Sequence, residues 1–141
     1  MYELTLNAAD LYVKAARFLS DKDGPIRLER LSGYLGAGEW SSLSHAARGA
    51  VAKAAARCGF ARHEWPYWRR AAAKVIHPDV LEKLHAWLPS APSPLAMETV
   101  YEECLGVSWA SVDREDKRLV SRALSDLGWS AIATWPLWRR Q

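Results

Sequence analysis

The sequence predicts a mainly α-helical protein built from two tandem copies of one small unit, and three observations support this fold class. Residues 65–70 recur at 135–140 with five of six residues identical, which chance does not produce in so short a chain. Shorter matches extend the repeat towards the N-terminus. Apolar residues recur at helical spacing within each copy, for example along 112–127. We therefore expect one unit over residues 1–73 and a second over 74–141.

The shorter matches mark the same features in both copies. They pair Gly24-Pro25 with Ser93-Pro94, Leu35-Gly36 with Leu105-Gly106, Trp40 with Trp109, and Cys58-Gly59-Phe60 with Leu127-Gly128-Trp129. The offset between the copies is 70 residues in the tail and 69 at Trp40. We expect these length changes in the turn after Gly36 and in the loop after Gly59, because loops tolerate them.

Three helices are expected in each copy. Their ranges are 8–20, 26–35 and 44–58 in the first copy, and 95–105 and 113–127 in the second, whose first helix starts at His77-Pro78. Gly36, Gly59, Gly106 and Gly128 end helices, as glycine commonly does. The aromatic tail contains Pro and suits an edge strand or short hairpin. Two helices, a tight turn, a third helix and a strand or wing form a small winged helix-turn-helix-like unit.

Composition and charge exclude several classes of protein. No run of about 18 apolar residues and no secretory leader pattern is present, so we expect a cytoplasmic protein without membrane contact. The two cysteines, Cys58 and Cys104, indicate neither a disulfide framework nor a zinc site. The net charge of +3 is uneven. Residues 1–70 carry 11 Lys/Arg against 7 Asp/Glu, whereas 71–141 carry 8 against 9.

The sequence contains no recognisable catalytic constellation. It lacks a phosphate-binding P-loop, a zinc-protease helix motif, a nucleophile elbow and a dinucleotide-binding glycine motif. Its four histidines occupy unequal positions in the two copies and form no ligand pattern. We therefore expect a protein that is not an enzyme and that uses no cofactor, metal or small-molecule substrate.

Cations at matching positions of the third helix are the main functional signal. Arg48 corresponds to Lys117, and Lys53 to Arg122. Such cations are usually only solvated, but in a helix-turn-helix unit this helix enters the major groove, where Arg and Lys contact phosphates and guanine. The tail cations would lie on a wing, or would only cover an edge strand. The candidate nucleic-acid-binding residues are Arg48, Lys53, Arg57, Arg62, Arg69, Arg70, Lys117, Arg118, Arg122, Arg139 and Arg140.

The eight tryptophans are expected to lie mostly in the core, because aromatic residues repeated at equivalent positions usually pack there. Trp129, which pairs with Phe60, and Trp87 are assigned to packing. The alternative for the other repeated tryptophans is a platform on which unpaired bases stack. Cys58 and Cys104 are interpreted as small buried hydrophobic residues.

Part of the second copy resembles a known module. Residues 98–106, 113–120 and 123–129 resemble the C-terminal module of phage-type primase-helicases of the virulence-associated protein E family: a short helix ending in Leu-Gly, a tight turn, a helix, and Leu-Gly-Trp before a basic strand. Residues 28–70 match it more faintly. The resemblance implies a winged-helix-like accessory domain of a mobile-element replication protein. The motor and primase parts are absent, so their activities are not implied.

Together these observations predict a non-enzymatic, DNA-binding protein of phage or mobile-element type, with duplex favoured over single-stranded DNA. The alternative is a small phage protein that binds and inhibits or adapts a host protein complex. The first copy is expected to lead DNA contact, because it carries the excess of cations and has Arg57 where the second has Asp126. The two units are expected to pack together, since each is near the lower size limit for a stable core.

Overall fold

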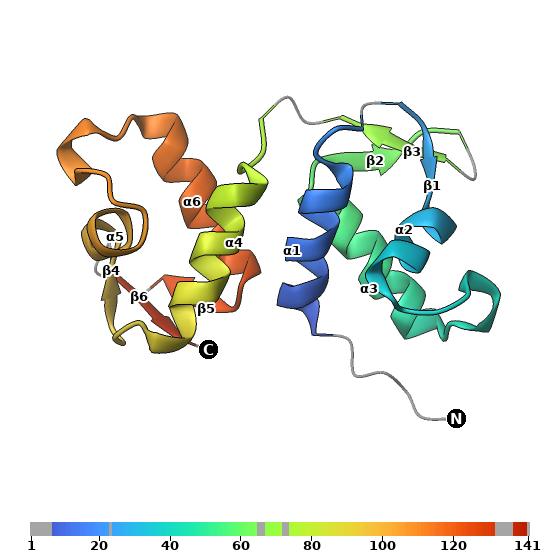
Figure 1. Cartoon of the computed structure of the whole chain (residues 1–141), viewed down its shortest axis with the longest axis horizontal. Coiled ribbons are helices and arrows are strands. Elements are labelled where there is room, and N and C mark those ends of the chain that lie inside the picture. The colour runs from blue at the N-terminus through green and yellow to red at the C-terminus, as the bar shows by residue number, and fades with distance from the viewer. Residues whose placement is uncertain (1–6, 23, 65–66, 72–73, 132–136, 141) are drawn as a thin grey trace. The chain divides into compact units, whose positions relative to one another are not determined.

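The computed structural model describes residues 7–22, 24–64, 67–71, 74–131 and 137–140. The chain divides into two compact units, Met1–Val75 and Ile76–Gln141. Six α-helices and two three-stranded sheets among the described residues make the fold mixed α/β and mainly helical (Figure 1). None of the described helices is long and apolar enough to cross a bilayer.

Unit 1 packs three helices beside one small antiparallel sheet (Figure 1). Its elements are α1 (Ala8–Leu19), β1 (Ile26–Arg27), α2 (Leu28–Leu35), a 3₁₀ turn (Trp40–Ser42), α3 (His45–Arg57), β2 (Phe60–Arg62) and β3 (Tyr67–Arg70). The side chain of Asn7 caps α1 by accepting hydrogen bonds from the backbone of Ala9 and Asp10, at 2.9 and 3.1 Å. Gly36 ends α2 in the left-handed conformation, with φ of 72°.

Unit 2 has the same order of elements. They are α4 (Pro78–Trp87), a 3₁₀ turn (Leu88–Ser90), β4 (Leu95–Ala96), α5 (Met97–Thr99), a π-helix (Val100–Cys104), a 3₁₀ turn (Trp109–Ser111), α6 (Arg114–Asp126), β5 (Trp129–Ala131) and β6 (Leu137–Arg140). The strand order is β4-β6-β5, as it is β1-β3-β2 in unit 1. The connectivity is therefore helix, strand, helix, turn, helix and hairpin in both units.

Of the two expectations for the aromatic tail, the hairpin is confirmed and the edge strand is wrong. The basic tails form β3 and β6, which lie in the middle of their sheets. The edge strands are β1 and β2 in unit 1 and β4 and β5 in unit 2, and β1 and β4 lie where a helix was expected to begin. Ile26 pairs with Trp68, and Leu95 with Trp138, so these apolar side chains join the sheet and the helix starts two residues later. A two-residue strand is too short to show an alternating pattern in the sequence.

The length change that was expected in the turn after Gly36 lies partly in the second helix of unit 2. The pairs Arg27/Ala96 and Trp40/Trp109 are 69 residues apart, whereas Gly36 and Gly106 are 70 apart. Unit 2 thus has one more residue in its second helix, and the π-helix Val100–Cys104 accommodates it. Such widened turns keep the flanking side chains on their original faces when a residue is inserted.

Each unit has its own buried side chains. Those of unit 1 include Leu11, Ala15, Leu19, Leu31, Val51, Ala54, Ala55 and Phe60. Those of unit 2 include Leu81, Leu84, Leu95, Met97, Val100, Val120, Leu124 and Trp129. Small residues line α1 and α3, which lets these two helices pack more closely than the other helix pairs of the described chain.

The expectations for tryptophan and cysteine hold in part. Trp129 and Trp138 are buried, but Trp40, Trp68, Trp87 and Trp109 are only half-buried. Trp65 and Trp135 lie outside the described residues. Cys58 is buried and Cys104 is half-buried, and neither forms a disulfide within the described residues. Burial also raises the pKa of the Cys104 thiol, which does not favour a reactive thiolate.

Candidate nucleic-acid interface

The third helix of each unit follows a tight turn and starts at a side-chain cap. Ser44 accepts a hydrogen bond from the backbone N–H of Ala47 at 3.1 Å, and Asp113 accepts one from Asp116 at 2.8 Å. These caps hold α3 and α6 directly after the turns that contain Trp40 and Trp109. Most of the sequence-predicted cations lie on these two helices and on β3 and β6.

The first cation pair that both copies retain is engaged within the fold. The guanidinium of Arg48 lies 5.4 Å from the centre of the Trp40 ring and donates hydrogen bonds to the carbonyls of Trp40 and Ser41, at 3.1 and 3.3 Å. The ammonium of Lys117 lies 4.2 Å from the centre of the Trp109 ring. Cation and tryptophan are thus retained together as a contact that fastens the turn to the helix.

Arg70 and Arg140 form a second retained contact. Arg70 Nη2 donates hydrogen bonds to the carbonyls of Leu19, at 2.6 Å, and Lys22, at the C-terminal end of α1. Arg140 Nη2 does the same to Leu88 and Ala91, at 3.1 and 3.2 Å. Each guanidinium also lies over the aromatic ring that starts the neighbouring strand. Both side chains add charged hydrogen bonds to carbonyls at the end of a helix, where those of Leu19 and Leu88 also accept one from a backbone N–H.

The other cations predicted in unit 1 are spread over separate elements. Lys53, Arg62 and Arg69 are exposed, and Arg57 is half-buried. On α3, Lys53 is the one exposed Lys or Arg, and its exposed neighbours are the small residues Ala46, Gly49 and Ala56, with His45 at the start of the helix. This helix therefore offers few side chains able to hydrogen-bond base edges.

By contrast, α6 exposes a row of arginines. Arg114, Arg118 and Arg122 follow one another at intervals of four residues, so they lie along one face at a rise of about 6 Å each. Arg118 has 77% of its side chain exposed and makes a long ion pair with Glu115, at 3.8 Å. Arg114 and Arg122 have no ion-pair partner among the described residues. We call these three residues the α6 arginine row.

Arg114 was missed in the sequence analysis. It is not among the candidate residues, and it has no cationic counterpart in the first copy, where His45 stands. The comparison of copies therefore gave it no weight. Its spacing of four residues from Arg118, and of eight from Arg122, was the available signal.

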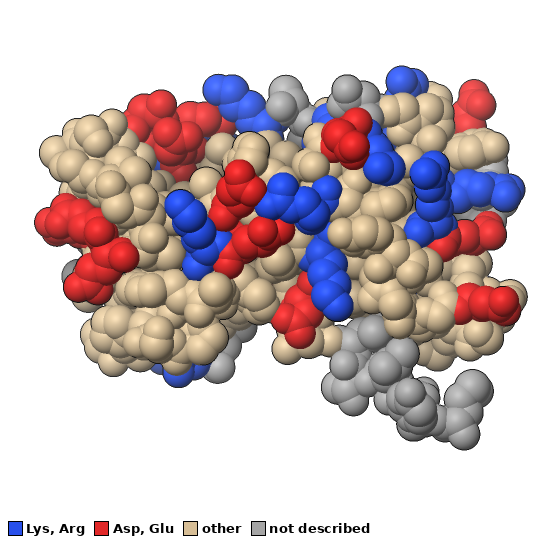
Figure 2. Space-filling view, viewed as in Figure 1, with Lys and Arg blue, Asp and Glu red and all other residues tan. Residues whose placement is uncertain are grey.

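Unit 2 also carries several carboxylates, on α6 itself and on the elements before it. Asp113, Glu115 and Asp116 occupy the first turn of α6, where they complement the helix dipole. Glu98, Glu102 and Glu103 are exposed on α5 and the π-helix. Figure 2 shows Asp and Glu side chains gathered around this end of unit 2, and several Lys and Arg side chains over the strands of unit 1. Asp126, which was expected to repel phosphate, has one carboxylate oxygen buried.

The remaining polar features of the described residues suggest no catalytic centre. No group of three His, Cys, Asp or Glu side chains is placed to hold a metal ion within the described ranges. An open pocket beside α2 is lined by Glu29, Glu39, Trp40, Ser41 and three glycines. Burial raises the pKa of the Tyr101 hydroxyl, which donates a hydrogen bond to the carbonyl of Asp116 at 3.0 Å. Tyr101 therefore acts as a neutral donor.

Comparisons with known proteins add no relative to this description. No family model matches the chain, and no curated protein or solved structure matches it.

Proposed function

We propose that this chain is a non-enzymatic protein that binds duplex DNA through two tandem winged helix-turn-helix-like units, with α6 as the leading contact. The α6 arginine row carries the proposal. Arginines on the exposed face of the helix that follows the tight turn are the groups that contact phosphates and guanine edges in this type of unit. The repeated order of helix, strand, helix, turn, helix and hairpin is consistent with it.

The leading unit differs from the one that net charge suggests. Four of the eleven candidate cations, Arg48, Arg70, Lys117 and Arg140, are engaged in contacts within their own unit. Arg48 and Arg70 count towards the positive charge of unit 1. On α3 itself, Arg48 is engaged and Arg57 is half-buried, so only Lys53 is an exposed Lys or Arg. The net charge of a unit therefore overstates the cations that it offers to DNA.

The resemblance to a phage primase-helicase accessory module supports the same class of partner. A tandem of two such units would act in the cytoplasm as an accessory DNA-binding part of a mobile-element replication system. Its role would be to hold DNA, in line with a sequence that contains no recognisable catalytic motif.

The salt dependence of binding tests this proposal. We expect wild-type protein to bind a short labelled duplex, with an affinity that falls steeply between about 50 and 200 mM salt. Replacing Arg114, Arg118 and Arg122 by Ala should weaken binding at every sequence and flatten the slope of log K against log salt by roughly two to three units. Lys53→Ala, the matched change on α3, should flatten it by at most about one unit.

Ser125→Ala, an exposed change on α6, is the control for helix integrity. Equal losses from the α6 variant and from Lys53→Ala would argue for two equivalent reading helices. A wild-type protein with no affinity for duplex DNA at low salt would contradict the proposal itself.

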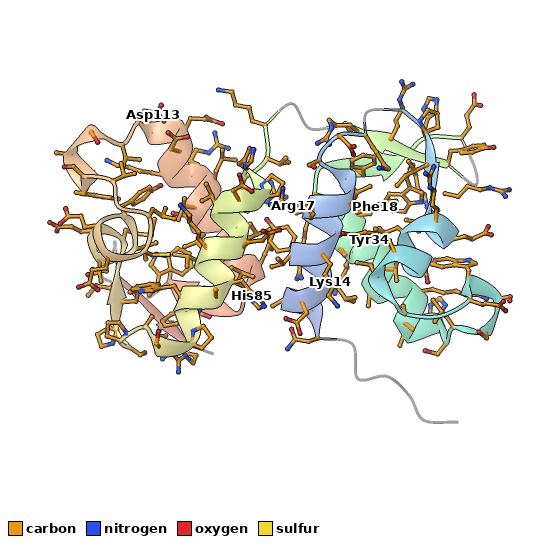
Figure 3. The ribbon with its side chains drawn as sticks, viewed as in Figure 1. Lys14, Arg17, Phe18, Tyr34, His85 and Asp113 are labelled. Carbon is orange, nitrogen blue, oxygen red and sulfur yellow. The ribbon has the colours of Figure 1, made fainter. Side chains whose placement is uncertain are left out.

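A second candidate function is docking to a protein partner. Phe18 of α1 and Tyr34 of α2 stack with ring centres 4.5 Å apart, and Tyr34 remains 49% exposed (Figure 3). Exposed aromatic side chains are typical anchors of protein interfaces. If the candidate holds, Tyr34→Ala should abolish co-purification of a host or phage protein from infected cells, and the α6 variant should leave it intact.

A further inference from the structure

The outer face of the unit 1 sheet combines two exposed arginines with an exposed tyrosine. Because neighbouring residues of a strand point to opposite faces, Trp68 and Arg70 of β3 face the helices, and Tyr67 and Arg69 face away from them. Arg27 stands directly opposite Tyr67 on β1. Its guanidinium lies 5.8 Å from the centre of the tyrosine ring. We call Arg27, Tyr67 and Arg69 the sheet-face triad.

The residues of the triad belong to paired strands. The backbone of Tyr67 accepts a hydrogen bond from His63 at 3.0 Å, and Arg69 stands opposite Ala61, whose small side chain leaves it uncovered. Tyr67 is 41% exposed, an unusual state for a tyrosine in the middle strand of a sheet. No acidic side chain stands opposite these residues in the strand pairing. In the described chain, Arg69 has no ion-pair partner.

We propose that the sheet-face triad binds a single-stranded nucleic acid, with one base stacked on Tyr67 and the adjoining phosphates paired with Arg27 and Arg69. This inference rests on the proposed function and adds a second site to it. Aromatic rings on an open sheet stack bases, and flanking arginines neutralise the backbone. In a duplex the bases already stack on each other, so their faces are not available to a tyrosine. The triad therefore favours unpaired nucleotides.

Unit 2 provides a natural comparison for this site. At the equivalent positions of its sheet stand Ala96, Leu137 and Arg139, with Ala96 opposite Leu137. One cation is kept, but the ring and the facing arginine are missing. The same backbone thus tolerates apolar residues here, so the fold does not require the triad.

Binding of labelled oligothymidylate at low salt tests the proposal. Arg27→Ala with Tyr67→Leu makes the unit 1 face like that of unit 2, so the fold should be preserved. We expect at least about a tenfold loss of affinity, since one stacked base contributes roughly that much. Arg139→Ala on the unit 2 sheet is the matched control and should change affinity by less than about threefold.

A cross-link gives a second readout at the residue itself. Oligothymidylate carrying one 5-iodouracil, irradiated in complex with wild-type protein, should attach to Tyr67, as detected by peptide mass spectrometry. A cross-link confined to other residues, or unchanged affinity in the double variant, would overturn the proposal. Equally strong competition by a polyglutamate peptide at the triad would also overturn the proposal. It would show that the negative charge of the ligand, without a stacked base, is enough for binding.

The two sites can fail separately. Loss of duplex binding in the α6 variant with normal oligothymidylate binding would support both assignments. Duplex binding by wild type, without any affinity for oligothymidylate, would remove the sheet-face proposal and leave the proposed function standing.

Discussion

At the scale of single residues, retention across the two copies has a structural explanation at two of the positions where it had suggested binding. Arg48 and Lys117 each lie over the tryptophan of the preceding turn, and that tryptophan is itself retained. Arg70 and Arg140 each fasten the middle strand to the end of the first helix. A duplicated fold keeps the contacts that hold it together as readily as the residues that bind a ligand.

Substitutions of Arg69 and Arg70, which are neighbours on β3, should distinguish a role in stability from a role in binding. Arg70→Ala removes charged hydrogen bonds to Leu19 and Lys22, so it should lower the free energy of unfolding by about 1.5–3 kcal/mol. Arg69→Ala changes an exposed side chain and should shift the free energy of unfolding by less than about 0.5 kcal/mol. Urea denaturation measures both. A larger loss of stability from Arg69→Ala would contradict the structural role of Arg70.

Tyr101 gives a prediction for alkaline pH. Its hydroxyl donates to the carbonyl of Asp116, so Tyr101→Phe should lower the free energy of unfolding by about 1 kcal/mol near neutral pH. Burial, and then the charges of Asp116 and Asp113, raise the pKa of this hydroxyl above its ordinary value of 10.0. The stabilisation is therefore complete below pH 10 and is lost as the pH rises above it, because only the unfolded chain ionises there.

The stability difference between wild type and Tyr101→Phe should accordingly shrink as the pH is raised through 10 in denaturation experiments. A difference that stays constant, or that grows with pH, would show that the hydroxyl is not held in its neutral form.

At the scale of elements, unit 2 accommodates one extra residue as a π-helix, where the sequence analysis assigned the change to a loop. The flanking residues explain why this works. Val100 and Tyr101 before the extra residue are buried, as are Leu31 and Ser32 in α2 of unit 1. The widened turn lets these side chains and the helix-ending Gly106 keep their places.

Removal of one residue tests this account. Deleting the exposed Glu102 should convert the π-helix into a regular α-helix, and the free energy of unfolding should change by less than about 1 kcal/mol. Deleting the exposed Gly33 from α2 should cost at least about 2 kcal/mol, since it turns Leu35 away from the core. Equal costs for the two deletions in urea denaturation would contradict the insertion model.

At the scale of the whole molecule, two units with separate buried cores raise the question of how far each is stable alone. Each contains only about 70 residues, a size at which a single core is marginal. The mutual packing expected from the sequence stays a prediction.

Expression of residues 1–75 tests it. We expect this fragment to unfold at a lower urea concentration than the full chain, because the packing predicted between the two units would be lost. The fragment 76–141 should behave in the same way. A cooperative transition at the full-chain midpoint for either fragment would show that the units are independently stable.

The sequence by itself determined where the helices lie and most of their ends, the starts of the second helices excepted, because the hydrophobic period, the capping residues and the glycines act locally. It also identified the repeat and the hairpin that follows each third helix. Only the tertiary structure decided that β3 and β6 are central strands, because a two-residue partner strand leaves no pattern in the sequence. For the cations of the candidate site, too, the sequence determined one part and the tertiary structure the other. Their number is visible in the sequence, but whether a guanidinium covers a ring, caps a carbonyl or faces solvent depends on the folded chain, and the carbonyls that Arg70 and Arg140 cap lie about 50 positions away.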